Sequence, residues 1–275
     1  YTGSFEEFGF WERDSYGELN YISVRQDMFE QEEFLNVSIW RILRIDEYIY
    51  LHAFSKIFVF DGEQIIRIIK SENAILPIFE YRGKPYVSIL NSGLFFINKD
   101  FKLVKEPGPD FLSELRIRQI FEMNNDTSVV FTEHNGIYLK IGKSFIQPEN
   151  EINLILKNYH INRAIRIDDH LFAIGTIKNG MLVTNHRGQI QFRLDKSNGL
   201  QNNAVLALRK DLNNNLWIGL EDGIDFAEIT SPFFIISDQT GKLGSVHRTV
   251  KYKNRFYVGT NHGLFYADWE CLINR

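Results

Sequence analysis

The feature that most constrains this chain is a repeat of about forty residues, marked by a glycine between two short apolar segments. The marker glycines are Gly93, Gly136, Gly180, Gly223 and Gly263, and successive members are 43, 44, 43 and 40 residues apart. Four short strands in about forty residues is the period of a propeller blade, whereas a helical solenoid would show apolar residues spaced by roughly 3.6. The sequence therefore predicts an all-β fold, a β-propeller of four-stranded antiparallel blades.

Two less regular copies extend the repeat toward the N-terminus. Lys56 stands where the glycine belongs, and the segment around Gly9 matches the second and third strands of the last copy, so the chain begins inside a repeat. We therefore expect about seven blades, with the first and the last incomplete, in a single propeller domain over residues 1–275. Weak fourth strands are expected at 19–23, 102–104 and 189–192, and short helical connectors at 111–115 or 151–156.

Composition and charge limit the partners of the chain. The 23 Phe and 12 Tyr residues favour sheet, because aromatic side chains pack well across strands. A net charge of −4 and a pI near 6.0 argue against direct nucleic-acid contact, which requires a basic surplus. No apolar run approaches the ~18 residues of a membrane span, so none is expected in this segment. The single cysteine, Cys271, cannot form an intrachain disulfide and is expected to be incidental.

A search for reactive groups favours no enzyme. Most carboxylates lie in predicted turns, where Asp and Glu bond their own backbone, whereas a propeller glycosidase would need two converging carboxylates. The sequence contains no phosphate loop, zinc spacing or nucleophile elbow, and its seven histidines are scattered. We therefore expect no catalytic residues, no metal and no cofactor, with His134 and His262 as ordinary turn residues.

Arginines recur on the predicted first strand of each blade, the strand that lines the channel of a propeller. They are Arg41 and Arg44, Arg116 and Arg118, Arg163 and Arg166, Arg209, and Arg248. If some face one channel mouth they would bind a carboxylate or sulfate group, since guanidinium pairs with planar oxyanions through two hydrogen bonds. The candidate ligand-binding residues are Arg41, Arg118, Arg163, His247 and Arg248. The alternative is that these side chains lie in solvent or pair with turn carboxylates.

The four tryptophans are expected to serve packing rather than sugar binding. Trp217 falls on a predicted central strand and should be core. At least three of the four are expected to lie between blades; the set is Trp11, Trp40, Trp217 and Trp269.

The segment 200–224 is the most regular copy of the repeat, and its distinctive residues are Leu200, Asn203, Val205, Asp211, Leu216, Trp217, Ile218, Gly219 and Gly223. With these residues the segment resembles the two-component regulator propeller repeat. The other copies keep the hairpin glycine and the aromatic strand but replace the tryptophan, by Tyr86 or Tyr257 for example. The opening of the chain also looks like the early blades of propeller regulators that carry a triple-tyrosine domain and a helix-turn-helix output domain.

This resemblance implies a function in bacterial signalling. The family's propellers are similar to periplasmic sensors of receptors anchored in the inner membrane, many of them associated with glycan-derived signals and with kinase or transcription-regulating outputs. It implies that this chain binds a small molecule or an oligosaccharide and acts as a sensor domain, with a possible homodimer through a blade face. Two alternatives stay open, a propeller lyase or glycosidase and a protein-interaction scaffold.

Overall fold

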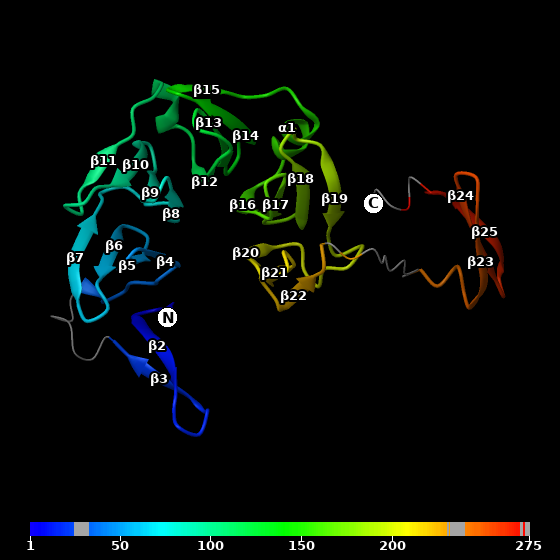
Figure 1. Cartoon of the computed structure of the whole chain (residues 1–275), viewed down its shortest axis with the longest axis horizontal. Coiled ribbons are helices and arrows are strands. Elements are labelled where there is room, and N and C mark those ends of the chain that lie inside the picture. Colours follow the sequence, from blue (N-terminus) through cyan, green and yellow to red (C-terminus); the bar gives the residue numbers. More distant parts are fainter. Residues whose placement is uncertain (25–32, 230, 232–239, 270–271, 273–275) are drawn as a thin grey trace. The chain divides into compact units, whose positions relative to one another are not determined.

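Seven small antiparallel sheets follow one another along the chain (Figure 1). The computed structural model describes residues 1–24, 33–229, 231, 240–269 and 272. Four of its sheets have four strands, β4–β7, β8–β11, β12–β15 and β16–β19, and three have three described strands, β1–β3, β20–β22 and β23–β25. The prediction of an all-β chain of about seven antiparallel blades is confirmed.

The strands are short, and brief helical segments connect some of them. The expected helical turns are both present, as a 3-10 turn at Asp110–Ser113 and as helix α1 at Glu151–Leu156. The expected fourth strands are present as β3, β11 and β19. The strand bounds are β1 Thr2–Ser4, β2 Glu7–Arg13, β3 Leu19–Ser23, β4 Arg41–Ile45, β5 Tyr48–His52, β6 Lys56–Phe60, β7 Ile65–Lys70, β8 Phe79–Tyr81, β9 Lys84–Ile89, β10 Gly93–Ile97, β11 Leu103–Lys105, β12 Ile117–Glu122, β13 Thr127–Thr132, β14 Ile137–Ile141, β15 Ser144–Ile146, β16 Ile161–Arg166, β17 Leu171–Thr176, β18 Met181–Asn185, β19 Ile190–Leu194, β20 Val205–Lys210, β21 Leu216–Leu220, β22 Ile224–Ala227, β23 Val246–Tyr252, β24 Arg255–Thr260 and β25 Gly263–Asp268.

The marker glycines occupy matching corners of successive sheets. Gly93 and Gly263 open β10 and β25, while Gly136, Gly180 and Gly223 directly precede β14, β18 and β22. All five have φ between 69° and 139°, a backbone conformation that glycine adopts at little cost. The repeat read from the sequence therefore marks the same hairpin in each sheet.

Several central strands, such as β6, β13 and β17, are buried on both faces, which explains their continuous apolar runs. In β6, Ile57 and Val59 pack toward the sheet β8–β11, whereas Phe58 and Phe60 pack toward the sheet β1–β3. Because side chains alternate along a strand, one apolar run supplies both of these cores.

The chain divides into two compact units, residues 1–149 with 153–161, and residues 150–152 with 162–275. In the first unit, three apolar cores join consecutive sheets from β1–β3 to β12–β15. In the second unit, one core joins β16–β19 to β20–β22, with Ala173 and Val183 on one side and Val205 and Ile218 on the other. That all 275 residues form one propeller domain stays a prediction.

The expectation that the tryptophans are core residues is wrong for three of the four. The relative exposures of Trp11, Trp40 and Trp217 are 52, 68 and 50%. Trp217 is exposed because strand alternation turns Leu216 and Ile218 toward the core with β16–β19 and Trp217 to the opposite face. There its ring contacts Phe226 at a centroid distance of 5.0 Å.

No helix in the described part of the chain is long and apolar enough to cross a membrane. Cys271 lies outside the described residues.

Candidate functional site

The hairpin between β13 and β14 places Glu133 and His134 at the edge of their sheet. Thr132, the last residue of β13, accepts a hydrogen bond from Asn135 N at 3.0 Å and donates one from Oγ1 to Gly136 O at 2.7 Å. These bonds close a turn in which Glu133 directly follows the strand. The backbone of Glu133 is held on both sides, since its N–H donates to Arg116 O at 2.8 Å and its carbonyl accepts from Ile161 N at 2.9 Å.

Two arginines of the neighbouring strand pair with this carboxylate. Arg118 lies in a β-bulge, because the register of β12 against β13 shifts between Ile117 and Gln119. Its Nη2 lies 2.5 Å from Glu133 Oε2, and Nη1 of Arg116, directly before β12, lies 3.2 Å from Glu133 Oε1. The Glu133 side chain is 5% exposed and that of Arg118 13%, so their pair is largely withdrawn from water.

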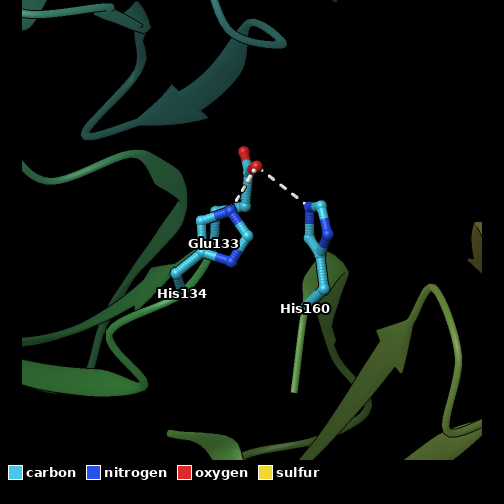
Figure 2. Close-up of side chains that lie close together, drawn as sticks. All are labelled: Glu133, His134 and His160. Atoms are coloured by element: carbon cyan, nitrogen blue, oxygen red, sulfur yellow. Dashed lines mark ion pairs between the residues drawn. The ribbon is translucent and has the colours of Figure 1, made fainter. Parts of the chain in front are cut away.

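Two histidines complete the cluster around the same carboxylate oxygen (Figure 2). His134 Nε2 lies 3.0 Å and His160 Nε2 2.9 Å from Glu133 Oε1. His160 directly precedes β16, and its ring centroid is 4.3 Å from that of His134. Both histidines remain partly exposed, so the cluster combines a buried carboxylate with accessible imidazoles. We call these five residues the Glu133 cluster: Arg116, Arg118, Glu133, His134 and His160.

The electrostatics of the cluster keep Glu133 ionised and favour a neutral His160. Burial raises the pKa of Glu133, but the charges of Arg118, His160 and His134 outweigh it and hold that pKa below its ordinary value. Burial lowers the pKa of His160, and the neighbouring Glu133 carboxylate opposes this only in part. The two guanidinium groups of Arg116 and Arg118 face the single carboxylate of Glu133, so the cluster carries a surplus positive charge.

Arg118 depends on Glu133 for its hydrogen bonding. Its Nε atom is buried and meets no acceptor among the described residues. Within the part of the chain that the structure describes, this side chain forms a single hydrogen bond, the short one from Nη2 to Glu133 Oε2. Loss of that carboxylate would therefore leave a largely buried cation without an acceptor.

The predicted ligand-binding residues all lie on first strands, as expected. Arg118 belongs to the Glu133 cluster, and Arg41 opens β4 in the same compact unit. Arg163 on β16 and the pair His247 and Arg248 on β23 belong to the other unit. A shared binding site for these residues stays a prediction.

The cluster also contains residues that the sequence analysis did not single out as functional. Glu133 and His160 were not recognised, and His134 was expected to be an ordinary turn residue. The view of the histidines as scattered is wrong for this pair. The only signal was the dipeptide Glu133-His134 before a marker glycine, and nothing near it in sequence points to His160, 27 residues further on.

Three of the turn aspartates, Asp61, Asp168 and Asp211, act as predicted. Asp61 Oδ1 accepts from the N–H groups of residues 63 and 64 at 2.9 and 2.8 Å. Asp168 does the same for residues 170 and 171 at 2.7 and 2.8 Å, and Asp211 for residues 213 and 215 at 2.8 and 2.9 Å. These side chains stabilise hairpins through their own backbone.

Comparison with solved structures identifies the fold. The extracellular domain of BT3049, assigned to a hybrid two component system of B. thetaiotaomicron, aligns with a TM-score of 0.61 at 13% identity, over 94% of this chain and 40% of that one. The extracellular domain of BT4673, assigned to a one component system of the same organism, aligns with a TM-score of 0.55 at 20% identity, over 90% and 37%. The fold is that of a β-propeller.

The WD40 propeller domain of Doa1 supports the same conclusion, with a TM-score of 0.53 at 8% identity over 81% of this chain and 85% of that domain. The expected resemblance to propeller sensors is therefore confirmed at the level of the fold. The chain spans about two-fifths of the length of the two B. thetaiotaomicron structures. No protein-family profile matches the sequence, and no curated protein matches it.

Proposed function

We propose that this chain is the ligand-binding part of an extracytoplasmic bacterial receptor, and that its ligand is a glycan fragment carrying an acidic group. The propeller likeness to two extracellular domains of signalling systems supports the receptor role. The observation that carries the ligand class is the surplus positive charge of the Glu133 cluster, where Arg116 and both imidazoles are accessible to solvent. An oxyanion at this position would accept hydrogen bonds from the Arg116 guanidinium.

The composition of the cluster favours binding over catalysis. Hydrolysis of a glycosidic bond uses two carboxyl groups, one of them kept protonated to act as the acid. Among the described residues, the cluster contains a single carboxylate, and Arg118 together with the histidines favours its ionised form. A binding role therefore accounts for the arrangement better than a lyase or glycosidase role.

Signal transmission would follow from a change in how two copies of the receptor pack. A ligand can shift such an equilibrium only if it binds the two states with different affinity. Sedimentation velocity with and without ligand would measure this shift, and an unchanged sedimentation coefficient would contradict the dimer step.

A thermal-shift screen tests the ligand class. The purified chain is heated with neutral, uronate-containing and sulfated oligosaccharides. A ligand at a concentration 100 times its Kd stabilises the native state by about 2.7 kcal/mol, so acidic oligosaccharides are expected to raise Tm by several degrees, and neutral ones are not.

Two matched variants locate the binding site. Arg116→Gln is expected to weaken binding of the acidic ligand roughly tenfold, equivalent to about 1.4 kcal/mol. Arg82→Gln removes a half-exposed arginine from the same compact unit and should leave the affinity unchanged. Equal affinity of both variants, or no stabilisation by any acidic oligosaccharide, would contradict the proposal.

A further inference from the structure

The nitrogen and oxygen atoms that face one another in the Glu133 cluster form a set of metal ligands. The ligand atoms of Glu133, His134 and His160 all lie within 4.8 Å of one another. Both Nε2 atoms are 2.9–3.0 Å from Glu133 Oε1. Tetrahedral zinc with bonds near 2.0–2.1 Å separates its ligands by roughly 3.3 Å. Each imidazole nitrogen would therefore move away from Oε1 by a few tenths of an ångström, and the two partly exposed imidazoles would move toward one another by up to about 1.5 Å to admit the ion.

We propose that Glu133 Oε1, His134 Nε2 and His160 Nε2 bind a divalent transition-metal ion of the zinc class. Imidazole nitrogen and carboxylate oxygen are ligands that suit Zn²⁺, whereas Ca²⁺ and Mg²⁺ prefer oxygen alone. Two histidines with one carboxylate are three protein ligands, which leaves a fourth position for water or an anion. The proposal does not rest on the sensory function.

The contacts around Glu133 hold its carboxylate in place before a metal ion binds. Its other oxygen, Oε2, is bound by Arg118, and its backbone is fixed by Arg116 O and Ile161 N. A hydrogen bond to the second oxygen of a ligating carboxylate fixes its orientation, as outer partners do in known metal sites. Arg118 can therefore keep its bond while Oε1 binds the metal.

The second arginine must give way for the ion to bind. Arg116 contacts the same Oε1 at 3.2 Å, but its side chain is 43% exposed and can turn into solvent. In the metal-free cluster each histidine donates its Nε2 proton to Oε1, so binding requires the tautomer protonated at Nδ1 instead. The metal adds two positive charges beside Arg118, so we expect an anion at the fourth position.

Metal titration of the whole purified chain tests the site without any sugar. After removal of metals by a chelator, Zn²⁺ alone is titrated by calorimetry, and Co²⁺ is used to record the visible absorption of a tetrahedral site. We expect one equivalent to bind. His134→Gln and His160→Gln should each weaken binding at least about tenfold, because each removes one of three ligands.

The chain offers a matched control in a second histidine pair. His170 and His186 have ring centroids 5.7 Å apart, and no carboxylate among the described residues completes a metal-binding group with them. The double variant His170→Gln/His186→Gln should bind Zn²⁺ as the unaltered chain does. The substituted histidines of the Glu133 cluster are partly exposed, and circular dichroism would verify that each variant folds.

Three results would overturn the metal site: no binding of Zn²⁺ to the unaltered chain, unchanged affinity in the double variant His134→Gln/His160→Gln, or an equal loss in the His170/His186 control. The glycan screen is run in the presence of a chelator, so its outcome does not depend on whether the chain binds a metal ion. If the chain binds Zn²⁺ but no acidic glycan, the metal site is supported and the proposed sensory ligand is wrong.

Discussion

Glu133 is the residue on which its cluster depends, because Arg116, Arg118, His134 and His160 all contact its carboxylate. Removing one partner of a buried ion pair leaves the other charge without compensation. Glu133→Gln is therefore expected to lower the free energy of unfolding by about 3–5 kcal/mol. Urea unfolding in the presence of a chelator would measure this loss.

The control for this substitution is Glu122→Gln. Glu122 pairs with Arg82 at 3.1 Å, and both side chains are more than 40% exposed. Exposed ion pairs contribute at most about 1 kcal/mol. If both variants lose a similar amount of unfolding free energy, burial does not strengthen the ion pairs of Glu133, and the prediction is wrong.

Glu33 gives the clearest pH dependence. Hydrogen bonds from Lys56 at 2.7 Å and Lys70 at 2.5 Å lower its pKa to about 2 from an ordinary value of 4.5. A lowered pKa in the folded state contributes stability above pH 4.5, and this contribution is lost as the pH falls toward 2. The stability difference between the unaltered chain and Glu33→Gln should therefore shrink between pH 4.5 and 2. Urea unfolding across this range would measure it, and a constant difference would contradict the assignment.

At the scale of the element, a bulge recurs at the start of first strands. The register shifts between residues 117 and 119 in β12, 205 and 207 in β20, and 246 and 248 in β23. Arg118 and His247, two of the predicted ligand-binding residues, occupy equivalent bulge positions. Each bulge lies next to the hairpin corner of its sheet, where the repeat allows side chains to differ between copies.

Close packing between sheets makes a second element-scale prediction. Gly175 lies near the end of β17, and a methyl group added there would overlap Val205 Cγ1 in the next sheet. Overpacking a tight core costs about 1–3 kcal/mol, so Gly175→Ala should destabilise the chain by that amount in urea unfolding. The double variant Gly175→Ala/Val205→Ala should recover part of the loss. If the losses of unfolding free energy in the two single variants simply add up in the double variant, the contact between residues 175 and 205 is contradicted.

At the scale of the whole molecule, burial on both faces predicts where the chain is most stable. Nearly every residue of β9 and β17 is buried, whereas β3 is exposed along most of its length. Amide hydrogens in buried central strands exchange with solvent only when larger parts of the structure open. We expect exchange in β9 and β17 to be at least about tenfold slower than in β3, as measured by mass spectrometry. Equal rates in the three strands would contradict this prediction.

Sequence alone determined the number of sheets, the hairpin corners and the turn role of the aspartates. These features are local: strand alternation and turn chemistry act between residues close in the chain, so a forty-residue repeat reveals them. It did not determine which face of β21 is covered, and the expectation for Trp217 was wrong for that reason.

Only the tertiary structure decided the site. His160 meets Glu133 because the chain returns to the corner of the sheet after β14, β15 and α1, where Ile161 N bonds to Glu133 O. The next copy of the same hairpin has Ile177 at the position of Glu133, so the repeat does not predict a carboxylate there. Contacts between residues far apart in the chain depend on packing, and no periodic pattern encodes them.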